Sequence, residues 1–351
     1  MTSDTFLLPN APAIPGLAFR HFRDPDDYHY MAAIARASAV VDGTERADTA
    51  EQLATLHAHL PNFDLSTDMI FAEVDAGDGR GPEAIGYSRG TWREEGNGDR
   101  WYSFVCRITP TWRRKGIGSV MLNWVEERLI EIAAAHPGET PKHFACSVQQ
   151  GEVGGAALLE KLGYQAIRYR FEMVRPDLED IADFLLPEGL EVRPVLPEHY
   201  RAIWDADTEA FRDHWASDEP TEEDYRAWLE DKTEFQPELW QIAWDIAENQ
   251  VAGQVRTYID REQNELYNRQ RGYTEFISVR RPWRRRGLAR ALIVRSLWAQ
   301  KQAGMKESAL WVDSENISGA TRVYEDCGFR VVKRATIYKK PLLLASNHTS
   351  Y

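Results

Sequence analysis

The feature that most constrains the fold of this chain is an internal repeat that spans most of its 351 residues. Three short segments of the first half recur in the same order in the second half. They are 15–20 and 188–193, 113–118 and 284–289, and 162–164 and 327–329, with glycines at offsets of 173, 171 and 165 residues. Solenoid repeats have periods of roughly 20–50 residues. A period this long therefore indicates a duplicated domain, and the chain also exceeds the usual size of one core.

The repeat predicts four segments along the chain. They are an N-terminal domain over 1–176, a linker over 177–188, a C-terminal domain over 189–345 and a tail over 346–351. Pro176 and Pro187 bracket the junction, where a mixed acidic and apolar segment is compatible with a short helix.

Each half alternates strand and helix patterns, which predicts a mixed α/β architecture. In the second half we expect strands over 190–195, 239–246, 251–259, 273–279, 308–312 and 329–338, and helices over 198–211, 221–230, 288–302 and 317–326. Thr221 followed by Asp224 resembles a capping box at a helix start. The first half has the same order, with a strand over 101–108 and a helix over 117–134.

A glycine turn rich in arginine lies between a strand and a helix in both halves. It comprises Arg284, Arg285, Arg286, Gly287, Leu288 and Ala289, and in the first half Arg113, Arg114, Lys115, Gly116, Ile117 and Gly118. A helix N-terminus offers unpaired N–H groups and a positive dipole end, which favour a pyrophosphate. A solvated basic patch or a nucleic-acid contact is the alternative. Recurrence at the same position of both halves favours the phosphate site.

These motifs resemble the acetyl-CoA signature of the GCN5-related N-acetyltransferases, Arg-x-x-Gly-x-Gly/Ala between a strand and a helix. The segments 108–113 and 279–284 resemble the run into that turn, and 316–329 resembles the closing helix of the family. The tandem arrangement and the segment 210–214 are most similar to mycothiol-synthase-type proteins. The resemblance implies two tandem domains of α+β type, each with a mixed, mostly antiparallel sheet flanked by helices.

The resemblance also implies the residues that bind the co-substrate, acetyl-CoA or another acyl-CoA. They are Ile277, Val279, Arg284, Arg285, Arg286, Gly287, Leu288, Ala289, Arg290, Asn316 and Tyr324. A possible second coenzyme A site comprises Ile108, Arg113, Arg114, Lys115, Gly116, Ile117, Gly118 and Ser119. For Asn316, an ordinary helix N-cap explains the residue equally well.

The implied reaction is direct attack of a substrate amine on the thioester in a ternary complex. In this scheme the backbone N–H of Val279 stabilises the oxyanion, and Tyr324 protonates the leaving thiolate, which suits a phenol of pKa about 10. Glu275 is the candidate water-linked base, because strand alternation places it on the same face as Val279. The alternative for Tyr324 is a tyrosine that only packs in the core. The alternative for Glu275 is an exposed strand carboxylate, with Ser278 or a water acting as the base instead.

The first half keeps the turn but changes the closing helix. Leu159 lies opposite Tyr324 in the repeat, and Gly151 lies opposite Asn316. A leucine cannot donate a proton, so we expect catalysis in the second domain. The first domain is then structural or a noncatalytic coenzyme A binder.

The acceptor is expected to be the primary amine of a small cationic molecule. His214 and Trp215 are candidates for lining its pocket, although a loop histidine can also cap a helix end. Residues 205–224 hold nine acidic side chains against one arginine, which suits a polyamine, an aminoglycoside or a basic peptide, yet acidic helices are often simply solvated.

Composition narrows the classes of function. The net charge of −13 disfavours a nucleic-acid-binding protein. The three widely spaced cysteines, Cys106, Cys146 and Cys327, predict reduced thiols and no metal site. Neither a signal peptide nor a membrane span is expected, which predicts a cytoplasmic protein, monomeric or homodimeric, with no membrane partner. An acyl-CoA-sensing module without catalysis is the alternative to an enzyme.

Overall fold

A computed structural model describes residues 4–45, 48–95, 98–136, 138, 140–212, 220–315 and 319–344. The chain forms two compact units. Unit 1 comprises Met1–Ile167 and Thr336–Tyr351, and unit 2 comprises Arg168–Ala335. None of the helices in these described ranges is both long enough and apolar enough to cross a membrane.

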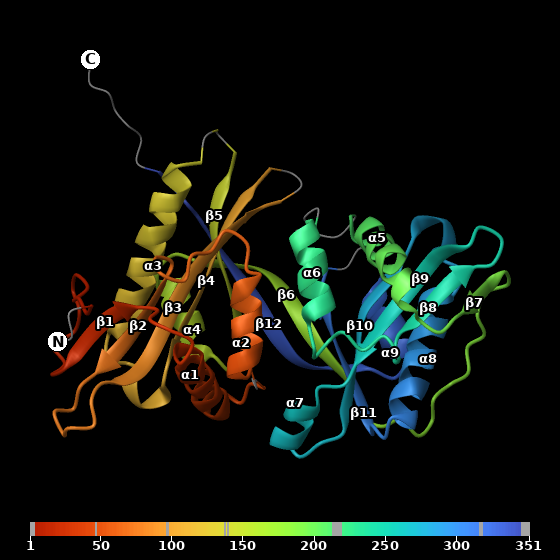
Figure 1. Ribbon diagram of the computed structural model, residues 1–351, viewed down its shortest axis with the longest axis horizontal. Coiled ribbons are helices and arrows are strands. Elements are labelled where there is room, and N and C mark those ends of the chain that lie inside the picture. The colour runs from red at the N-terminus through yellow and green to blue at the C-terminus, as the bar shows by residue number, and fades with distance from the viewer. Residues whose placement is uncertain are drawn as a thin grey trace. The chain divides into compact units, whose positions relative to one another are not determined.

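Unit 1 is built on one mixed sheet with helices on both faces (Figure 1). Its strand order is β1 (Leu17–His21), β2 (Met69–Val74), β3 (Glu83–Glu94), β4 (Arg100–Ile108), β5 (Lys142–Gln149) and the end of β12 (Arg330–Pro341). Strands β1 to β4 are antiparallel, and β4 and β5 are parallel. Helices α1 (Asp27–Asp42) and α2 (Ala50–Ala58) pack on one face, whereas α3 (Ile117–Ala134) and α4 (Val153–Lys161) pack on the other.

Unit 2 repeats this plan (Figure 1). Its strand order is β6 (Gln165–Arg175), β11 (Glu307–Asp313), β10 (Arg271–Val279), β9 (Gln250–Tyr258), β8 (Gln241–Asp245) and β7 (Leu190–Val192). Only β10 and β11 are parallel among these pairs of described strands. The helices are α5 (Tyr200–Phe211), α6 (Glu222–Glu230), α7 (Arg261–Leu266), α8 (Leu288–Gln302) and α9 (Ala320–Asp326). Two tandem units of α+β type, each with a mostly antiparallel sheet, are therefore confirmed.

The last strand of each sequence repeat lies in the sheet of the other unit. Strand β6 ends the first repeat, yet its residues 170–175 pair with β11 of unit 2. Strand β12 ends the second repeat, and from Thr336 onward it belongs to unit 1 beside β5. The compact units therefore have different boundaries from those that the repeat predicts, 1–176 and 189–345.

The segment 177–188, which the repeat predicts as a linker, contributes to the core of unit 2. Leu178 and Ile181 are buried in the cluster that contains α8 and α9. The Arg175 guanidinium donates hydrogen bonds of 2.6–2.8 Å to the carbonyls of Asp177, Asp180 and Cys327. Burial of two apolar side chains and three charge-assisted hydrogen bonds fixes this segment on its own unit.

Local sequence patterns give most of the elements that surround the site. The predicted capping box is present, because Thr221 Oγ1 accepts from the Asp224 N–H at 3.2 Å and the Asp224 carboxylate accepts from the Thr221 N–H at 2.6 Å. Helix α7 was not predicted. It is only six residues long and begins after Asp260, whose carboxylate accepts from the Gln263 N–H at 2.8 Å.

Candidate active site

The arginine turn has the same geometry in both units. The Nε of Arg284 donates to the carbonyl of Val279 at 2.9 Å, and the Nε of Arg113 donates to the carbonyl of Ile108 at 3.1 Å. The first arginine of each motif therefore ties the turn to the end of the preceding strand. Nη2 of Arg284 also donates to the carbonyl of Ala210 at 3.1 Å. This arginine has a structural role that its sequence pattern did not indicate.

The next residues bring the backbone into a helix N-terminus. Arg285 and Arg114 have φ of 59° and 62°, and Gly287 and Gly116 have φ of 85° and 90°. Both glycines are the left-handed N-caps of α8 and α3. Left-handed backbone is costly for most residues and free for glycine, which explains why glycine recurs at this position.

The space over the turn differs between the units. A Cβ built on Gly287 meets no described atom within 4 Å, whereas one built on Gly116 lies 3.7 Å from Cβ of Pro12. Arg285 makes no hydrogen bond or ion pair with the described residues. An open helix N-terminus with a free guanidinium beside it suits a phosphate group.

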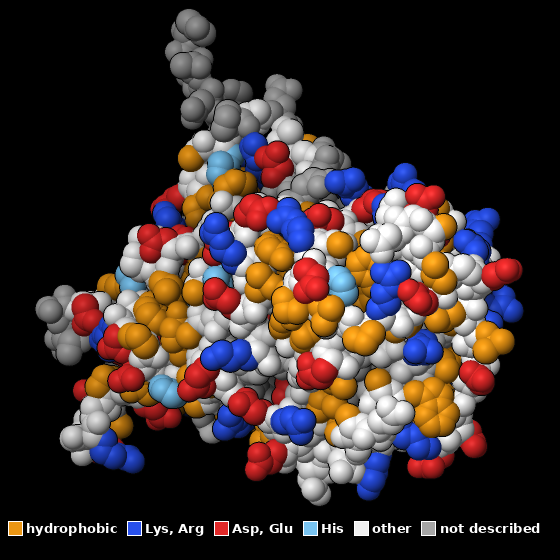
Figure 2. All heavy atoms as spheres, turned by 45° about the vertical axis from the view of Figure 1, so that its right-hand side comes forward, with side chains coloured by type: hydrophobic (Ala, Val, Ile, Leu, Met, Phe, Trp, Pro, Cys, Tyr) orange, Lys and Arg blue, Asp and Glu red, His pale blue; other side chains and the backbone are white. Residues whose placement is uncertain are grey.

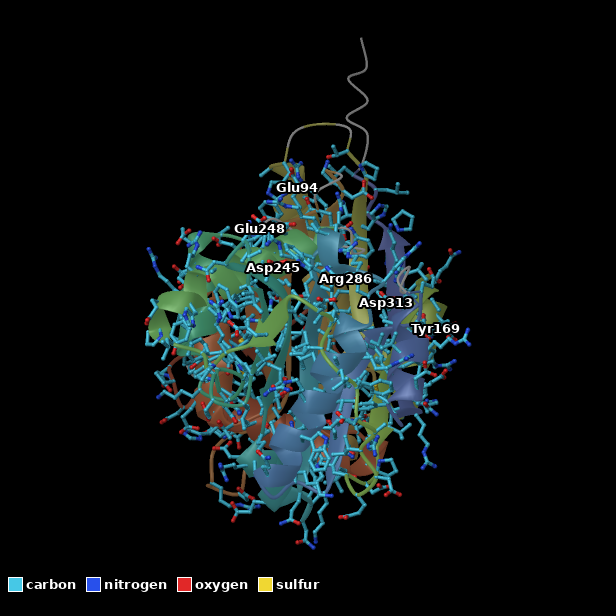
Figure 3. The ribbon with its side chains drawn as sticks, turned by 90° about the vertical axis from the view of Figure 1, so that its right-hand side faces the viewer. Glu94, Tyr169, Asp245, Glu248, Arg286 and Asp313 are labelled. Carbon is cyan, nitrogen blue, oxygen red and sulfur yellow. The ribbon has the colours of Figure 1, made fainter. Side chains whose placement is uncertain are left out.

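Neighbouring acidic and basic groups hold the flanks of this turn. The Asp245 carboxylate accepts a hydrogen bond from Trp283 Nε1 at 2.9 Å, and Figure 3 shows Arg286 and Asp245 on the same side of unit 2. Nη2 of Arg286 donates to the carbonyl of Glu188 at 3.2 Å, and Arg290 forms an ion pair with Asp326. Figure 2 shows acidic and basic side chains interspersed on the visible face, so charge alone marks no site there.

Strand β10 carries a β-bulge that β4 lacks. The register between β10 and β9 shifts between Glu275 and Ser278, and Phe276 has φ of 49°. By contrast, β4 pairs with β3 without a shift over Arg100–Ile108. Glu275 lies opposite Arg256, and Val279 lies opposite Gly253. The bulge therefore places Glu275 and Val279 on opposite faces of β10, so the shared face predicted from strand alternation is wrong. A positive φ on a non-glycine residue is strained, and such strain clusters at functional sites.

The backbone N–H of Val279 points away from β9. The Arg280 N–H donates to the carbonyl of Ala252 at 3.0 Å, and Val279 is paired with Gly253. Alternate residues of an antiparallel pair direct their N–H groups to opposite sides. The N–H of Val279 is therefore directed toward the side of β10 that faces β11.

Strands β10 and β11 pair only at their beginnings, over Arg271–Tyr273. Beyond this point the Glu275 side chain reaches β11, because its Oε1 accepts a hydrogen bond of 2.6 Å from the Trp311 N–H. Burial raises the pKa of Glu275 to about 8, against the opposing effect of the Trp311 N–H. A carboxyl with a pKa near the working pH is suited to exchange protons.

Tyr324 on α9 is buried in the same unit. Its side chain belongs to the core cluster of unit 2 and is 7% exposed. Burial raises its pKa above the usual 10, and the negative charge of Glu275 raises it further. The phenol is therefore protonated at neutral pH, and it lies within electrostatic range of Glu275.

A second carboxyl with a raised pKa lies near Glu275, and the sequence did not single it out. Burial raises the pKa of Glu234 to about 7, and the charge of Asp231 contributes. The charge of Glu234 in turn raises the pKa of Glu275. Glu234 lies in an irregular segment between α6 and β8, where no periodicity indicates its environment.

Arg256 and its partners complete this region of unit 2. Its Nη2 donates to Asp207 at 2.6 Å, and its guanidinium lies 4.2 Å from the ring centre of Phe276 and 5.3 Å from that of Trp228. Ser278, the alternative base, donates from Oγ to Asp207 at 2.7 Å. The predicted residues His214, Trp215 and Asn316 lie outside the described residues.

Unit 1 lacks the corresponding chemistry. By strand pairing, Val105 lies opposite Arg89 as Glu275 lies opposite Arg256, and in the repeat Leu159 aligns with Tyr324. Arg107 Nη1 forms an ion pair of 2.9 Å with Glu152. Neither a base nor an acid therefore occupies the equivalent positions.

Comparison with known proteins agrees with this geometry. Residues 200–329 match the model of the Acetyltransferase (GNAT) family. A mycothiol acetyltransferase of Kineococcus radiotolerans is 31% identical over 254 residues, which cover 70% of this chain and 74% of that protein. The chain belongs to the GNAT family of acetyltransferases. A mycothiol acetyltransferase of Salinispora arenicola is 27% identical, covering 87% of this chain and 91% of that protein.

Solved structures show the same fold for this GNAT protein. A GCN5-related N-acetyltransferase from Sphaerobacter thermophilus has a TM-score of 0.70 and 24% identity, covering 97% of this chain and 98% of that one. A tandem GNAT protein from the clavulanic acid biosynthesis pathway has a TM-score of 0.65 and 13% identity, covering 94% and 100%. Acetyl transfer from acetyl-CoA, the co-substrate of the family, is the activity to which these findings point.

Proposed function

We propose that unit 2 transfers an acetyl group from acetyl-CoA to the primary amine of a small, cationic acceptor by direct attack in a ternary complex. The observation that carries this proposal is the presence in one unit of Glu275, a carboxyl with a pKa of about 8, and the protonated Tyr324, whose pKa the charge of Glu275 raises. Near pH 8 the ionised Glu275 can take a proton and Tyr324 can give one, as acyl transfer to an amine requires.

Acetyl-CoA would supply the activated thioester. The open turn at Gly287, with the free guanidinium of Arg285, fits its pyrophosphate. The proposed contacts of Ile277, Leu288, Ala289 and Arg290 adjoin this turn. Arg284 instead holds the turn in place, because its Nε and Nη2 are hydrogen bonded to protein carbonyls.

The proposed proton path uses three groups of this chain. Glu275 accepts the proton that the amine loses as its nitrogen bonds to the acetyl carbon. The Val279 N–H, which points away from β9, donates to the carbonyl oxygen as negative charge develops there. Tyr324 gives its proton to the coenzyme A sulfur when the carbon–sulfur bond breaks, and proton exchange with water then restores Glu275 and Tyr324.

The surroundings of Glu275 support a cationic acceptor. Glu234 and Glu275 both have a raised pKa, so a protonated amine nearby would favour their charged forms. The guanidinium of Arg256 already lies over the rings of Trp228 and Phe276, so the two carboxyls are the groups proposed to recognise the ammonium.

Unit 1 is proposed to have no part in the chemistry. It has Val105 and Leu159 at the two catalytic positions, and its Arg113 is held by Asp42 through hydrogen bonds of 2.6 and 2.8 Å. The backbone of Gly151 also approaches Asp42 so closely that an added Cβ would lie 1.6 Å from its carbonyl oxygen. These contacts favour a structural role over coenzyme A binding at 108–119.

The test is an acetyl transfer screen with free thiol release as the readout. Wild type is compared with Glu275→Gln and Tyr324→Phe on polyamines, aminoglycosides, basic peptides and the acceptor of the mycothiol acetyltransferases. The proposal expects at least one amine to release thiol in the wild type and much less in both variants. Tight binding of acetyl-CoA with no turnover on any amine would instead favour an acyl-CoA-sensing module.

A further inference from the structure

The two units carry arginines at equivalent positions, but only one of these arginines has an acidic partner. Gly86 and Arg89 on β3 match Gly253 and Arg256 on β9, each as Gly-x-x-Arg. The pairing registers agree, because Tyr87 lies opposite Arg107 and the matching Gln254 lies opposite Ser278. Arg89 and Arg256 thus occupy the same place in the repeated fold.

In unit 2 the charge of this arginine is compensated. Arg256 forms an ion pair of 2.6 Å with Asp207, which is supplied by α5. In unit 1 the corresponding helix offers no such partner, because α1 has no acidic residue between Asp27 and Asp42. Arg89 makes no hydrogen bond or ion pair with any described residue, and its guanidinium lies 5.9 Å from the ring centre of Phe63.

A neighbouring arginine adds to the positive charge around Arg89 that no carboxylate compensates. Tyr87 is two residues away on the same face of β3, so the opposite residue Arg107 is a diagonal neighbour of Arg89. Burial lowers the pKa of Arg89, and the charge of Arg107 also lowers it, against the effect of Tyr87. Glu152 is ion-paired with Arg107, so its carboxylate does not compensate the charge of Arg89.

His57 adds unsatisfied polar groups beside Arg89. It lies on α2, is 5% exposed, and neither ring nitrogen has a hydrogen-bond partner among the described residues. Its ring stacks on Tyr28 at 5.6 Å and contacts Phe63 at 5.4 Å. Burial, followed by the charge of Arg89, lowers the pKa of His57 to about 4, so the ring is neutral and retains one N–H donor.

We propose that Arg89 and His57 form a binding site in unit 1 for a small oxyanion, a carboxylate or phosphate group of a metabolite. A partly buried guanidinium without an acid and a buried ring without a partner both cost free energy that a bound oxyanion would recover. Arginine presents paired N–H donors that match such groups. The site is separate from the turn at Gly116, and it does not depend on the acetyl transfer assigned to unit 2.

The test uses the full chain and two probes, inorganic phosphate and acetate, at constant ionic strength maintained with sodium chloride. Binding is measured by calorimetry for wild type, Arg89→Gln and the control Arg80→Gln. Arg80 is an exposed arginine of the same unit, so its substitution removes one charge far from the stacked rings. We expect Arg89→Gln to weaken at least one probe by about tenfold or more, the loss expected for charge-assisted hydrogen bonds, and Arg80→Gln to bind like wild type.

A second variant, His57→Phe, keeps the stacked ring but removes its nitrogens, and it should also weaken binding. The probe with the larger dependence on Arg89 identifies whether a phosphate or a carboxylate is preferred. Melting temperatures check that each variant is folded. Equal affinities for both probes in wild type and folded Arg89→Gln, or an equal loss in Arg80→Gln, would overturn the proposal.

Discussion

The raised pKa of Glu275 predicts the pH dependence of acetyl transfer. Burial raises this pKa to about 8, so the fraction of Glu275 in the active, ionised form increases as the pH rises through that value. For a group with a pKa of 8, the ionised fraction rises about tenfold between pH 7 and pH 9. The pKa of Tyr324 is raised above 10, so the acid stays protonated over this interval. We expect kcat/KM to rise by about this factor with a midpoint near pH 8.

Two variants distinguish the rise of kcat/KM with pH, called the basic limb below, from titration of the acceptor amine. Glu234→Gln removes a charge that raises the pKa of Glu275, so the midpoint should move to lower pH. Glu275→Gln should lower kcat/KM by about 10²–10⁴-fold, the range for loss of a general base, and should abolish the basic limb. Initial rates from pH 6 to 10 with a saturating acyl donor measure both effects. An unchanged basic limb in Glu275→Gln, or an unmoved midpoint in Glu234→Gln, would refute the reasoning.

Three further predictions concern the turn, the acid and the core. Gly287→Glu should abolish acetyl-CoA binding by calorimetry because it places a carboxylate at the phosphate site, whereas Gly116→Glu should leave transfer largely intact; the reverse pattern in folded variants would move catalysis to unit 1. Tyr324→Phe should lower kcat by about 10²–10⁴-fold with little change in acetyl-CoA affinity, and wild-type turnover with chemistry rate-limiting would remove it from the mechanism. Arg175→Ala should lower the free energy of unfolding by about 3–5 kcal/mol because three carbonyls lose a charged donor, which urea denaturation would contradict if the loss were below about 1 kcal/mol.

The sequence was sufficient for features that depend on local pattern. The repeated glycine of the turn follows from its left-handed conformation at Gly116 and Gly287. Helix α8 and strand β10 follow from apolar periodicity, and the turn joins the strand that carries Glu275 to this helix.

Other features depend on contacts that no local pattern encodes. Phe276 has no residue type that indicates a positive φ, so the bulge in β10 was not predicted. The exchange of β6 and β12 was not predicted either, because a strand has the same alternation whichever sheet it joins. The raised pKa of Glu234 likewise comes from burial by residues distant in sequence.

The position of β6 in unit 2 limits how the chain can be divided. A fragment that starts after Pro176 would contain α8, β10 and the turn, but it would lose the strand that pairs with β11 over Ser308–Asp313. Its β11 would then be an open edge with unpaired N–H and C=O groups, a template for intermolecular strand addition. We therefore expect such C-terminal fragments to aggregate or to form strand-swapped oligomers. A fragment that begins at Gln165 would retain the whole of β6.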